Sequence, residues 1–303
     1  MPAASASIAV TTLEQQASSV FGRIATLGGA YGIAVQPLLD KLVFVSEEVA
    51  AFVLVAVPHS FDRIAASTPI KRGGDVIARI APLSEAADPD QLARFEQLAA
   101  SDTRDLYAEL DHGPDGFAFT LQAFGNRKLD TDLSRLAAVG ADTTGAREVA
   151  VLLGAEDNLV GVTDRSGGTW TMHVRQRNRD DAERAATRQR VAAAGAALGV
   201  TQAQINVTAA LHDTFAKDND SYAFIRLTKT GLSRELGITW GGIAWEHVVR
   251  MMLGFYPGAD TAKRLGELSG AFDSQVAAAV ELTLLPTEPP RMRVAATLTK
   301  GLP

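Results

Sequence analysis

The chain has 303 residues, of which 47% are hydrophobic and 21% charged, and its formal net charge is −6. This composition is typical of a soluble globular protein and excludes extensive disorder. The acidic and basic residues are interspersed, which argues against a nucleic-acid groove or a polybasic membrane patch and favours a small-molecule or protein partner. We expect a monomer.

Several site classes are excluded by what the sequence lacks. With no cysteine there are no disulfides, no thiolate nucleophiles and no thiolate-held metal. The five histidines form no metal-binding pair, and no phosphate-binding glycine motif is present, so we expect no metal or nucleotide cofactor. The apolar run 49–57 is far shorter than the roughly 18 residues of a membrane span, and the N-terminus does not read as a secretory signal. We therefore expect a cytoplasmic protein without a membrane segment.

Hydrophobic periodicity follows one repeating order along the chain, two helices and then a hairpin. Segments with a helical apolar period are expected as helices near 13–27, 35–50, 75–80, 89–100, 130–139, 144–153, 180–199, 203–211, 245–254 and 259–272. Segments that alternate apolar and polar residues are expected as strands near 52–57, 61–67, 106–111, 117–124, 160–164, 169–175, 222–228, 233–240, 279–285 and 291–298.

The series reads as five ααββ units without a linker, so we predict one domain over residues 1–303. The units span approximately 12–67, 75–124, 130–176, 181–240 and 244–298. Sequential hairpins place their strands side by side, and ten strands in order can curl until the first meets the last. The sequence thus predicts an α+β fold: a closed ten-stranded antiparallel barrel with an outer ring of helices. An open antiparallel sheet is the alternative.

The two faces of the predicted strands differ in a way that favours closure. One face is apolar and must meet the helices. The other face carries few of the Lys and Glu residues that solubilise a wet sheet, and instead holds Thr171, His173, Arg175, Tyr222, Phe224, Arg226 and Arg293. This mixture is what we expect for the lining of a solvated barrel interior.

The fourth hairpin allows a register prediction. If Thr230 and Gly231 form a two-residue turn, Arg226 faces Glu235 and Phe224 faces Gly237. Strict alternation then turns Glu235 inward and Arg234 outward, unless a bulge restores Arg234 to the interior.

Four segments carry a resemblance to a known family. The third hairpin DRSGGTWTMHVR, the return strand TGLSRELGITW, the strand SFDRIAAS and the final hairpin VELTLLPTEPPRMRVAATL resemble the corresponding parts of the aromatic prenyltransferases of the ABBA, or PT-barrel, type. The likeness covers nearly the whole chain at low identity. It implies a PT barrel and transfer of a prenyl group from an isoprenoid diphosphate to an electron-rich aromatic small molecule, as in secondary metabolism.

The resemblance also implies roles for individual residues. Diphosphate departure requires cations and hydrogen-bond donors, and an allylic cation requires aromatic faces. The candidates for substrate binding are Arg63, Thr171, Arg175, Tyr222, Phe224, Arg226, Arg234 and Arg293, and the candidate catalytic residues are His173 and Glu235. Because Arg63 stands where magnesium-independent members place an arginine, we expect no strict magnesium requirement.

Two features depart from the family pattern. Phe119 stands where members usually carry a lysine, and Glu235 is a carboxylate in a region that should attract diphosphate. A PT-barrel protein that takes another ligand, or catalyses another reaction without prenyl diphosphate, is therefore the alternative function, and a non-catalytic interaction protein is a third. Arg177 and Arg179 read as part of a solvated helix face. Arg293→Ala is expected to lower prenyl-diphosphate binding or kcat/KM about 10²-fold with little effect on folding.

Overall fold

The computed structural model describes residues 20–45, 53–70, 81, 88–99, 103–216, 219–272 and 276–298. The predicted helix 75–80 and the beginning of the predicted helix 13–27 lie outside these residues. The strands are β1 (Val53–Pro58), β2 (Ile64–Ile70), β3 (Thr103–Gly113), β4 (Gly116–Gly125), β5 (Leu159–Arg165), β6 (Thr169–Gln176), β7 (Ser221–Thr228), β8 (Gly231–Ala244), β9 (Val276–Leu284) and β10 (Arg291–Leu298).

The ten strands close into one antiparallel barrel in which every strand pairs with its neighbours in sequence. Closure is made by β1 and β10, whose pairing runs from Val53 opposite Leu298 to Pro58 opposite Arg293. The predicted barrel is confirmed, and the open sheet is excluded. All five hairpin turns lie at one end, which we call the turn end; the connections to helices lie at the other, which we call the helix end.

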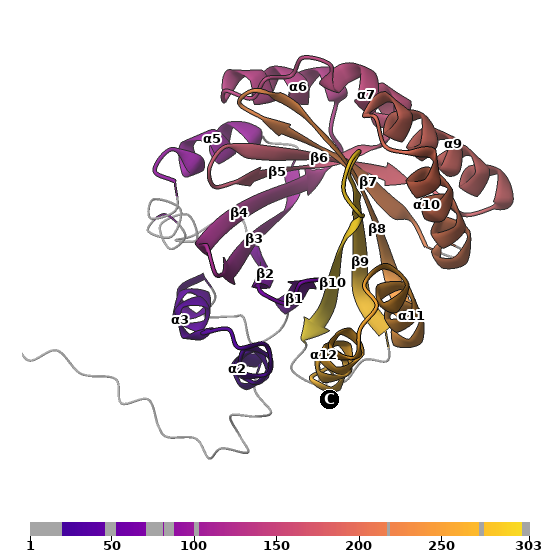
Figure 1. Cartoon of the computed structure of the whole chain (residues 1–303). Coiled ribbons are helices and arrows are strands. Elements are labelled where there is room, and N and C mark those ends of the chain that lie inside the picture. The colour runs from indigo at the N-terminus through magenta and orange to yellow at the C-terminus, as the bar shows by residue number, and fades with distance from the viewer. Residues whose placement is uncertain are drawn as a thin grey trace, which may run out of the picture.

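The helices surround the barrel as an outer layer (Figure 1). They are α2 (Val20–Tyr31), α3 (Gln36–Val45), α5 (Gln91–Leu98), α6 (Leu129–Ala138), α7 (Ala146–Leu152), α8 (Ala155–Asn158), α9 (Asp181–Ala197), α10 (Gln202–Phe215), α11 (Trp245–Phe255) and α12 (Ala259–Gly270). The first and last of them meet, since the Tyr31 hydroxyl donates to the Arg264 carbonyl oxygen over 3.1 Å.

The hydrophobic core lies between the barrel wall and the helices. Trp170, Met172 and Val174 of β6 point outward and are completely buried, as the alternation predicts. Trp240 of β8 and Phe119 of β4 lie in the same layer. The interior face is thereby left to the polar and aromatic half of each strand, which positions the candidate site.

Helix α9 begins later than its arginine-rich approach suggests. Asp180 is the N-cap, and its side chain accepts a hydrogen bond from the backbone N–H of Glu183. Arg177 and Arg179 therefore precede the helix and do not belong to its solvated face. No helix among the described residues is long and apolar enough to cross a membrane.

The fourth hairpin differs from its predicted register near the turn. Beyond the turn, Phe224 faces Gly237 as predicted, and Tyr222 faces Thr239. At the turn itself, however, Thr228 faces Gly231, so the two connecting residues are 229 and 230. The register shifts between Ile225 and Leu227, where β8 inserts extra residues opposite Arg226.

Candidate functional site

The interior of the barrel remains accessible to solvent. Arg226 lies on β7 and Arg293 on β10, and β8 and β9 separate these two strands. Each of the two side chains is 31% exposed. In a fully packed interior, charged side chains are buried and all their polar atoms are paired with protein atoms. The exposure of these two arginines shows that this part of the interior is not fully packed. The interior is thus open to solvent around these two arginines.

A row of four rings crosses the interior face from β3 to β7. The ring centroids of Tyr107 and Phe124 are 5.9 Å apart, those of Phe124 and His173 are 5.4 Å apart, and those of His173 and Phe224 are 5.7 Å apart. The Arg226 guanidinium lies 5.9 Å from the Phe224 centroid. We call these four residues the aromatic row. Tyr107, Phe124 and His173 are half-buried and can offer ring faces to a bound cation, whereas Phe224 is 2% exposed.

Two glycines make room for the rings of this row. A Cβ on Gly161 of β5 would collide with the Phe124 ring, and a Cβ on Gly237 of β8 would collide with the Phe224 ring. Each ring therefore lies across the neighbouring strand's backbone, which fixes its orientation.

His173 is the polar member of the aromatic row. Burial lowers its pKa to about 4, and the nearby positive charge of Arg226 acts in the same direction, so the imidazole is neutral at pH 7. Its Nε2 atom is buried and has no hydrogen-bond partner among the described residues. This nitrogen is free to accept a proton from a ligand or to donate a hydrogen bond to one.

Ion pairs fill the half of the interior near the turn end. Arg293 on β10 binds Glu109 on β3 over 2.8 Å. Burial lowers the pKa of Arg293, but Glu109 and Glu281 outweigh it and raise the pKa above its ordinary value. The guanidinium is held charged, and its nearest carboxylate is already bound to it.

A second group of charges is centred on Asp111. Arg63 binds this carboxylate over 3.0 Å and also Asp115 over 2.9 Å, while Arg165 binds Asp111 over 2.7 Å. Burial opposes ionisation of Asp111, yet the two arginines overcome it and its pKa lies below the ordinary value.

A third group contains the predicted pair of the fourth hairpin. The Arg226 guanidinium donates to Glu235 as expected, and Arg291 approaches the other Glu235 oxygen at 3.8 Å. Glu235 thus points inward, where two arginines stabilise its charge. Arg234 is exposed, so the extra residues of β8 do not bring it into the interior.

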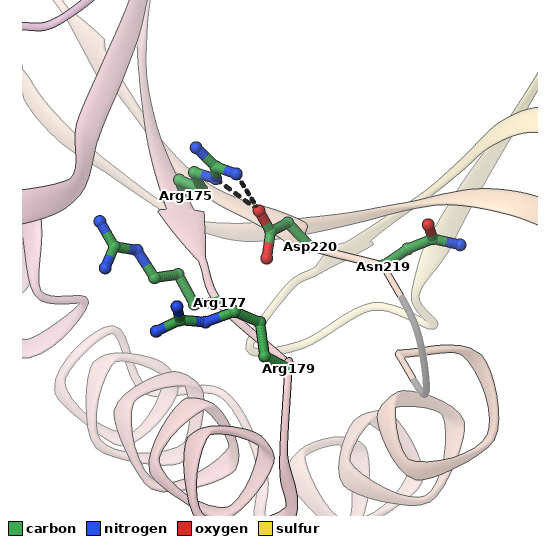
Figure 2. Close-up of a pocket in the computed structure, with 5 residues that line it drawn as sticks. All are labelled: Arg175, Arg177, Arg179, Asn219 and Asp220. Atoms are coloured by element: carbon green, nitrogen blue, oxygen red, sulfur yellow. Dashed lines mark hydrogen bonds and ion pairs between the residues drawn. The ribbon is translucent and has the colours of Figure 1, made fainter.

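A hollow of about 540 Å³ opens at the helix end, where β6 leaves and β7 enters the barrel. Arg175, Arg177, Arg179, Asn219 and Asp220 line it (Figure 2). The Nε atom of Arg175 donates to Asp220 over 2.6 Å. We call this feature the three-arginine pocket.

Metal ligands are not gathered anywhere in the part of the chain that the structure describes. No group of three or more His, Asp or Glu side chains there could hold a metal ion. Magnesium independence stays a prediction.

Comparison with family models gives no match to the sequence, and comparison with curated proteins gives none either. Solved structures match closely in fold. The 5-dimethylallyltryptophan synthase from Streptomyces coelicolor aligns with 94% of this chain and 97% of its own, at a TM-score of 0.65 and 10% identity. AnaPT from Neosartorya fischeri aligns with 96% of each chain, at a TM-score of 0.70 and 11% identity. The fold is the PT barrel.

Further structures of similar proteins contain ligands. The synthase from Streptomyces coelicolor has been solved with DMASPP and Trp. The prenyltransferase PriB, 13% identical over 94% of this chain and 96% of its own with a TM-score of 0.58, has been solved with L-tryptophan and dimethylallyl thiolodiphosphate. At such identities the likeness establishes the fold of this chain alone.

Within this PT barrel the predicted site residues fall into three places. Thr171, Tyr222, Phe224 and His173 line the middle and the helix half of the interior, where Tyr222 is 39% exposed. Arg63, Arg226, Glu235 and Arg293 gather toward the turn end in the ion pairs, and Arg175 lines the three-arginine pocket. Arg234 lies apart from all of them.

Sequence reasoning missed half of the aromatic row and most of the interior carboxylates. Tyr107 and Phe124 alternate with apolar residues in β3 and β4, so strand parity could have found them. Phe119 points into the buried outer layer instead of the interior, which places it outside any diphosphate site. Interior carboxylates that parity could also have identified are Glu109, Asp111 and Glu281.

Proposed function

We propose that this PT-barrel protein is an aromatic prenyltransferase that moves a prenyl group from an isoprenoid diphosphate to an electron-rich aromatic small molecule in the cytoplasm. The observation that carries the proposal is the aromatic row on the accessible interior face, in a fold shared with prenyltransferases across nearly the full length of both chains.

The proposed step uses the aromatic row as the place where the prenyl cation forms. The bond between the prenyl C1 and the diphosphate oxygen breaks, and the electron pair leaves with the diphosphate. The π face of Phe124 stabilises the allylic cation, and an acceptor carbon bonds to C1. The proton released from that carbon passes to a base, for which we propose the free Nε2 of His173. A neutral imidazole of low pKa suffices, because the arenium proton is strongly acidic.

The test is a transfer assay on the full chain. Dimethylallyl and geranyl diphosphate are offered with phenolic and indolic acceptors, tryptophan included, and products are identified by the added prenyl mass. We expect transfer with at least one pair, retained in EDTA, and lowered about 10²-fold in kcat by His173→Ala. Arg250→Gln on the exposed side of α11 is the control. Absence of transfer with every pair of donor and acceptor would contradict the proposed activity. Activity that is lost in EDTA and restored by Mg²⁺ would contradict magnesium independence.

A second function is favoured by the charge pattern near the turn end. The interior arginines of that half are each bound to a carboxylate, so a diphosphate there would have to displace one. A neutral or zwitterionic aromatic ligand would avoid that cost. Binding of an acceptor such as tryptophan, with no transfer from any donor and no donor binding, would favour this ligand-binding function.

A further inference from the structure

The three-arginine pocket continues the interior face of β6 beyond the barrel. Thr171, His173 and Arg175 alternate along that face, and Arg177 and Arg179 follow at the same spacing. Alternate residues of a strand share one face, and β6 ends at Gln176, so this rule places Arg175 alone. Arg177 and Arg179 follow in the connection to α9; all three arginines line the same hollow, and the side chains of Arg177 and Arg179 extend in one direction in Figure 2.

The residues that line the pocket are three arginines, one asparagine and one aspartate. Arg175 binds Asp220, and Arg179 binds Glu183 over 2.5 Å. The side chain of Arg177 is exposed and makes no ion pair or hydrogen bond with any described residue. Glu183 has its pKa lowered to about 2, chiefly by Arg179, and the charge of Arg177 contributes. Asp180 also acts on Arg179, so three carboxylates lie near the three guanidinium groups. Among the described residues, none of them forms an ion pair with Arg177.

A buried hydrogen-bond network fixes the backbone beneath these arginines. The Asn178 amide nitrogen donates to the carbonyl oxygens of Gln176 and Asn219 over 3.2 and 3.1 Å. Its amide oxygen lies 3.1 Å from His212 Nε2, and His212 Nδ1 accepts from Trp240 Nε1 over 3.2 Å. Both walls of the pocket are therefore tied to one buried side chain.

The segment on the other side of Asn178 is held as well. The Thr187 hydroxyl of α9 donates to the Arg177 carbonyl oxygen over 3.3 Å, and the Arg179 N–H donates to Glu183 over 2.8 Å. Arg177 therefore extends from a fixed backbone into the pocket. A preorganised cation loses less entropy when it binds an anion than one on a mobile loop.

We propose that the three-arginine pocket is an anion-binding subsite that takes a phosphate or diphosphate group. Arginine forks bind such groups through paired charge-assisted hydrogen bonds, for which Arg177 is free and Arg175 can exchange Asp220. In so far as the anion belongs to a prenyl donor, the inference rests on the proposed function. The prenyl chain would then run along β6 toward His173, which is two residues from Arg175 on the same face.

The experiment is calorimetric titration of the full chain with inorganic phosphate, inorganic diphosphate and dimethylallyl thiolodiphosphate. We expect wild type to bind diphosphate, Arg177→Gln to weaken binding about tenfold, and Arg250→Gln to leave it unchanged. Asp220→Asn should strengthen binding several-fold, because it releases Arg175 from its carboxylate. Affinity should also fall as salt is added.

The three ligands separate the sources of the anion. Equal losses for diphosphate and the thiolodiphosphate in Arg177→Gln identify a prenyl donor, whereas a loss for the inorganic ions alone identifies free phosphate or diphosphate; either supports the subsite. No binding of any of the three to wild type, or unchanged affinities in Arg177→Gln, would overturn it.

The transfer assay keeps this inference distinct from the proposed function. Prenyl transfer with an unchanged donor KM in Arg177→Gln would retain the enzyme and overturn the donor subsite. Diphosphate binding that Arg177→Gln abolishes, in a protein without transfer activity, would retain the subsite and overturn the enzyme.

Discussion

The two ends of the barrel use the same residue type under different conditions. Near the turn end, Arg63, Arg226 and Arg293 each lie against an interior carboxylate, and the pairs link neighbouring or distant strands. At the helix end, Arg177 has no ion-pair partner among the described residues and lies beside two arginines that each bind a carboxylate. An arginine inside a barrel is therefore no measure of anion affinity by itself, since its nearest carboxylate decides whether the charge is available.

The origin of the difference is the strand register. Arg293 on β10 reaches Glu109 on β3 across β1 and β2, so the closed barrel brings together residues far apart in sequence. The helix end instead draws its cations from one short segment, Arg175 at the end of β6 and Arg177 and Arg179 just after it, and Arg177 has no ion-pair partner among the described residues. At the turn end the arginines form ion pairs with interior carboxylates. At the helix end Arg177 forms no ion pair with any described residue.

The largest loss of stability is expected when the hydrogen-bond network of His212, Asn178 and Trp240 is broken. His212→Ala removes a buried ring and leaves Trp240 Nε1 and the Asn178 oxygen without their partner, so it should lower the free energy of unfolding by about 3 kcal/mol. Urea denaturation measures this, with Thr214→Ala on the exposed side of α10 as the control. A loss below about 1 kcal/mol would mean that the pocket backbone is held in another way.

Arg293→Ala tests the partner network of the turn half. It should lower the free energy of unfolding by about 2 kcal/mol, because Glu109, whose side chain is 9% exposed, loses its counter-charge. Adding Glu109→Gln should restore about half of that loss. The sequence-based expectation of unaltered folding overlooked this pair. Strict additivity of the two substitutions in urea denaturation would show that the pair contributes no coupling.

The pH dependence of the free energy of unfolding should show the contribution of the buried His212. Burial lowers the pKa of His212 to about 4, below the ordinary 6.5. As the pH falls, His212 is protonated in the unfolded chain before it is protonated in the folded protein. The contribution of the neutral His212 to the free energy of unfolding is therefore fully present above pH 6.5 and is lost as the pH falls toward 4. Asp164, whose burial raises its pKa to about 6, acts in the opposite direction.

The comparison of two variants isolates the histidine contribution. Between pH 6.5 and 5, His212→Ala should lose about 1.5 kcal/mol less stability than wild type does. Thermal or urea unfolding at both pH values measures the difference. If the free energy of unfolding changes equally with pH in wild type and in His212→Ala, the expected contribution of His212 is contradicted.

The smallest effect is expected for Arg177→Gln on stability. An exposed, unpaired side chain should change the free energy of unfolding by less than about 0.5 kcal/mol. Arg293→Ala, by contrast, is expected to lower the free energy of unfolding by about 2 kcal/mol. If urea denaturation shows Arg177→Gln to be as destabilising as Arg293→Ala, the two ends do not differ as described.

Strand alternation alone predicted the barrel and much of its interior. Parity in β6 and β7 correctly separated His173, Phe224 and Arg226 from the apolar outer face, because a closed barrel obeys the two-residue period. The inward direction of Glu235 followed from the same rule. The roles of the candidate residues remain predictions.

Other features depend on information that one strand does not contain. The turn at 229–230 was predicted one residue too late because the extra residues of β8 break the simple sum of paired positions. Arg177 and Arg179 were assigned to a helix face, since an arginine-rich approach and an arginine-rich helix look alike. The Arg293–Glu109 pair requires closure of the barrel, which joins strands that no local pattern relates.

Closure by β1 and β10 also has a consequence in time. Val53 meets its partner Leu298 only when the last strand exists, so no shorter nascent chain can complete the barrel. Until then the edges of β1 and of the newest strand are unpaired, and such edges promote association with other chains. Because the closing contacts span most of the sequence, loop-closure entropy makes this step slow. The protein should accordingly depend on chaperones during synthesis more than a helical protein of equal length.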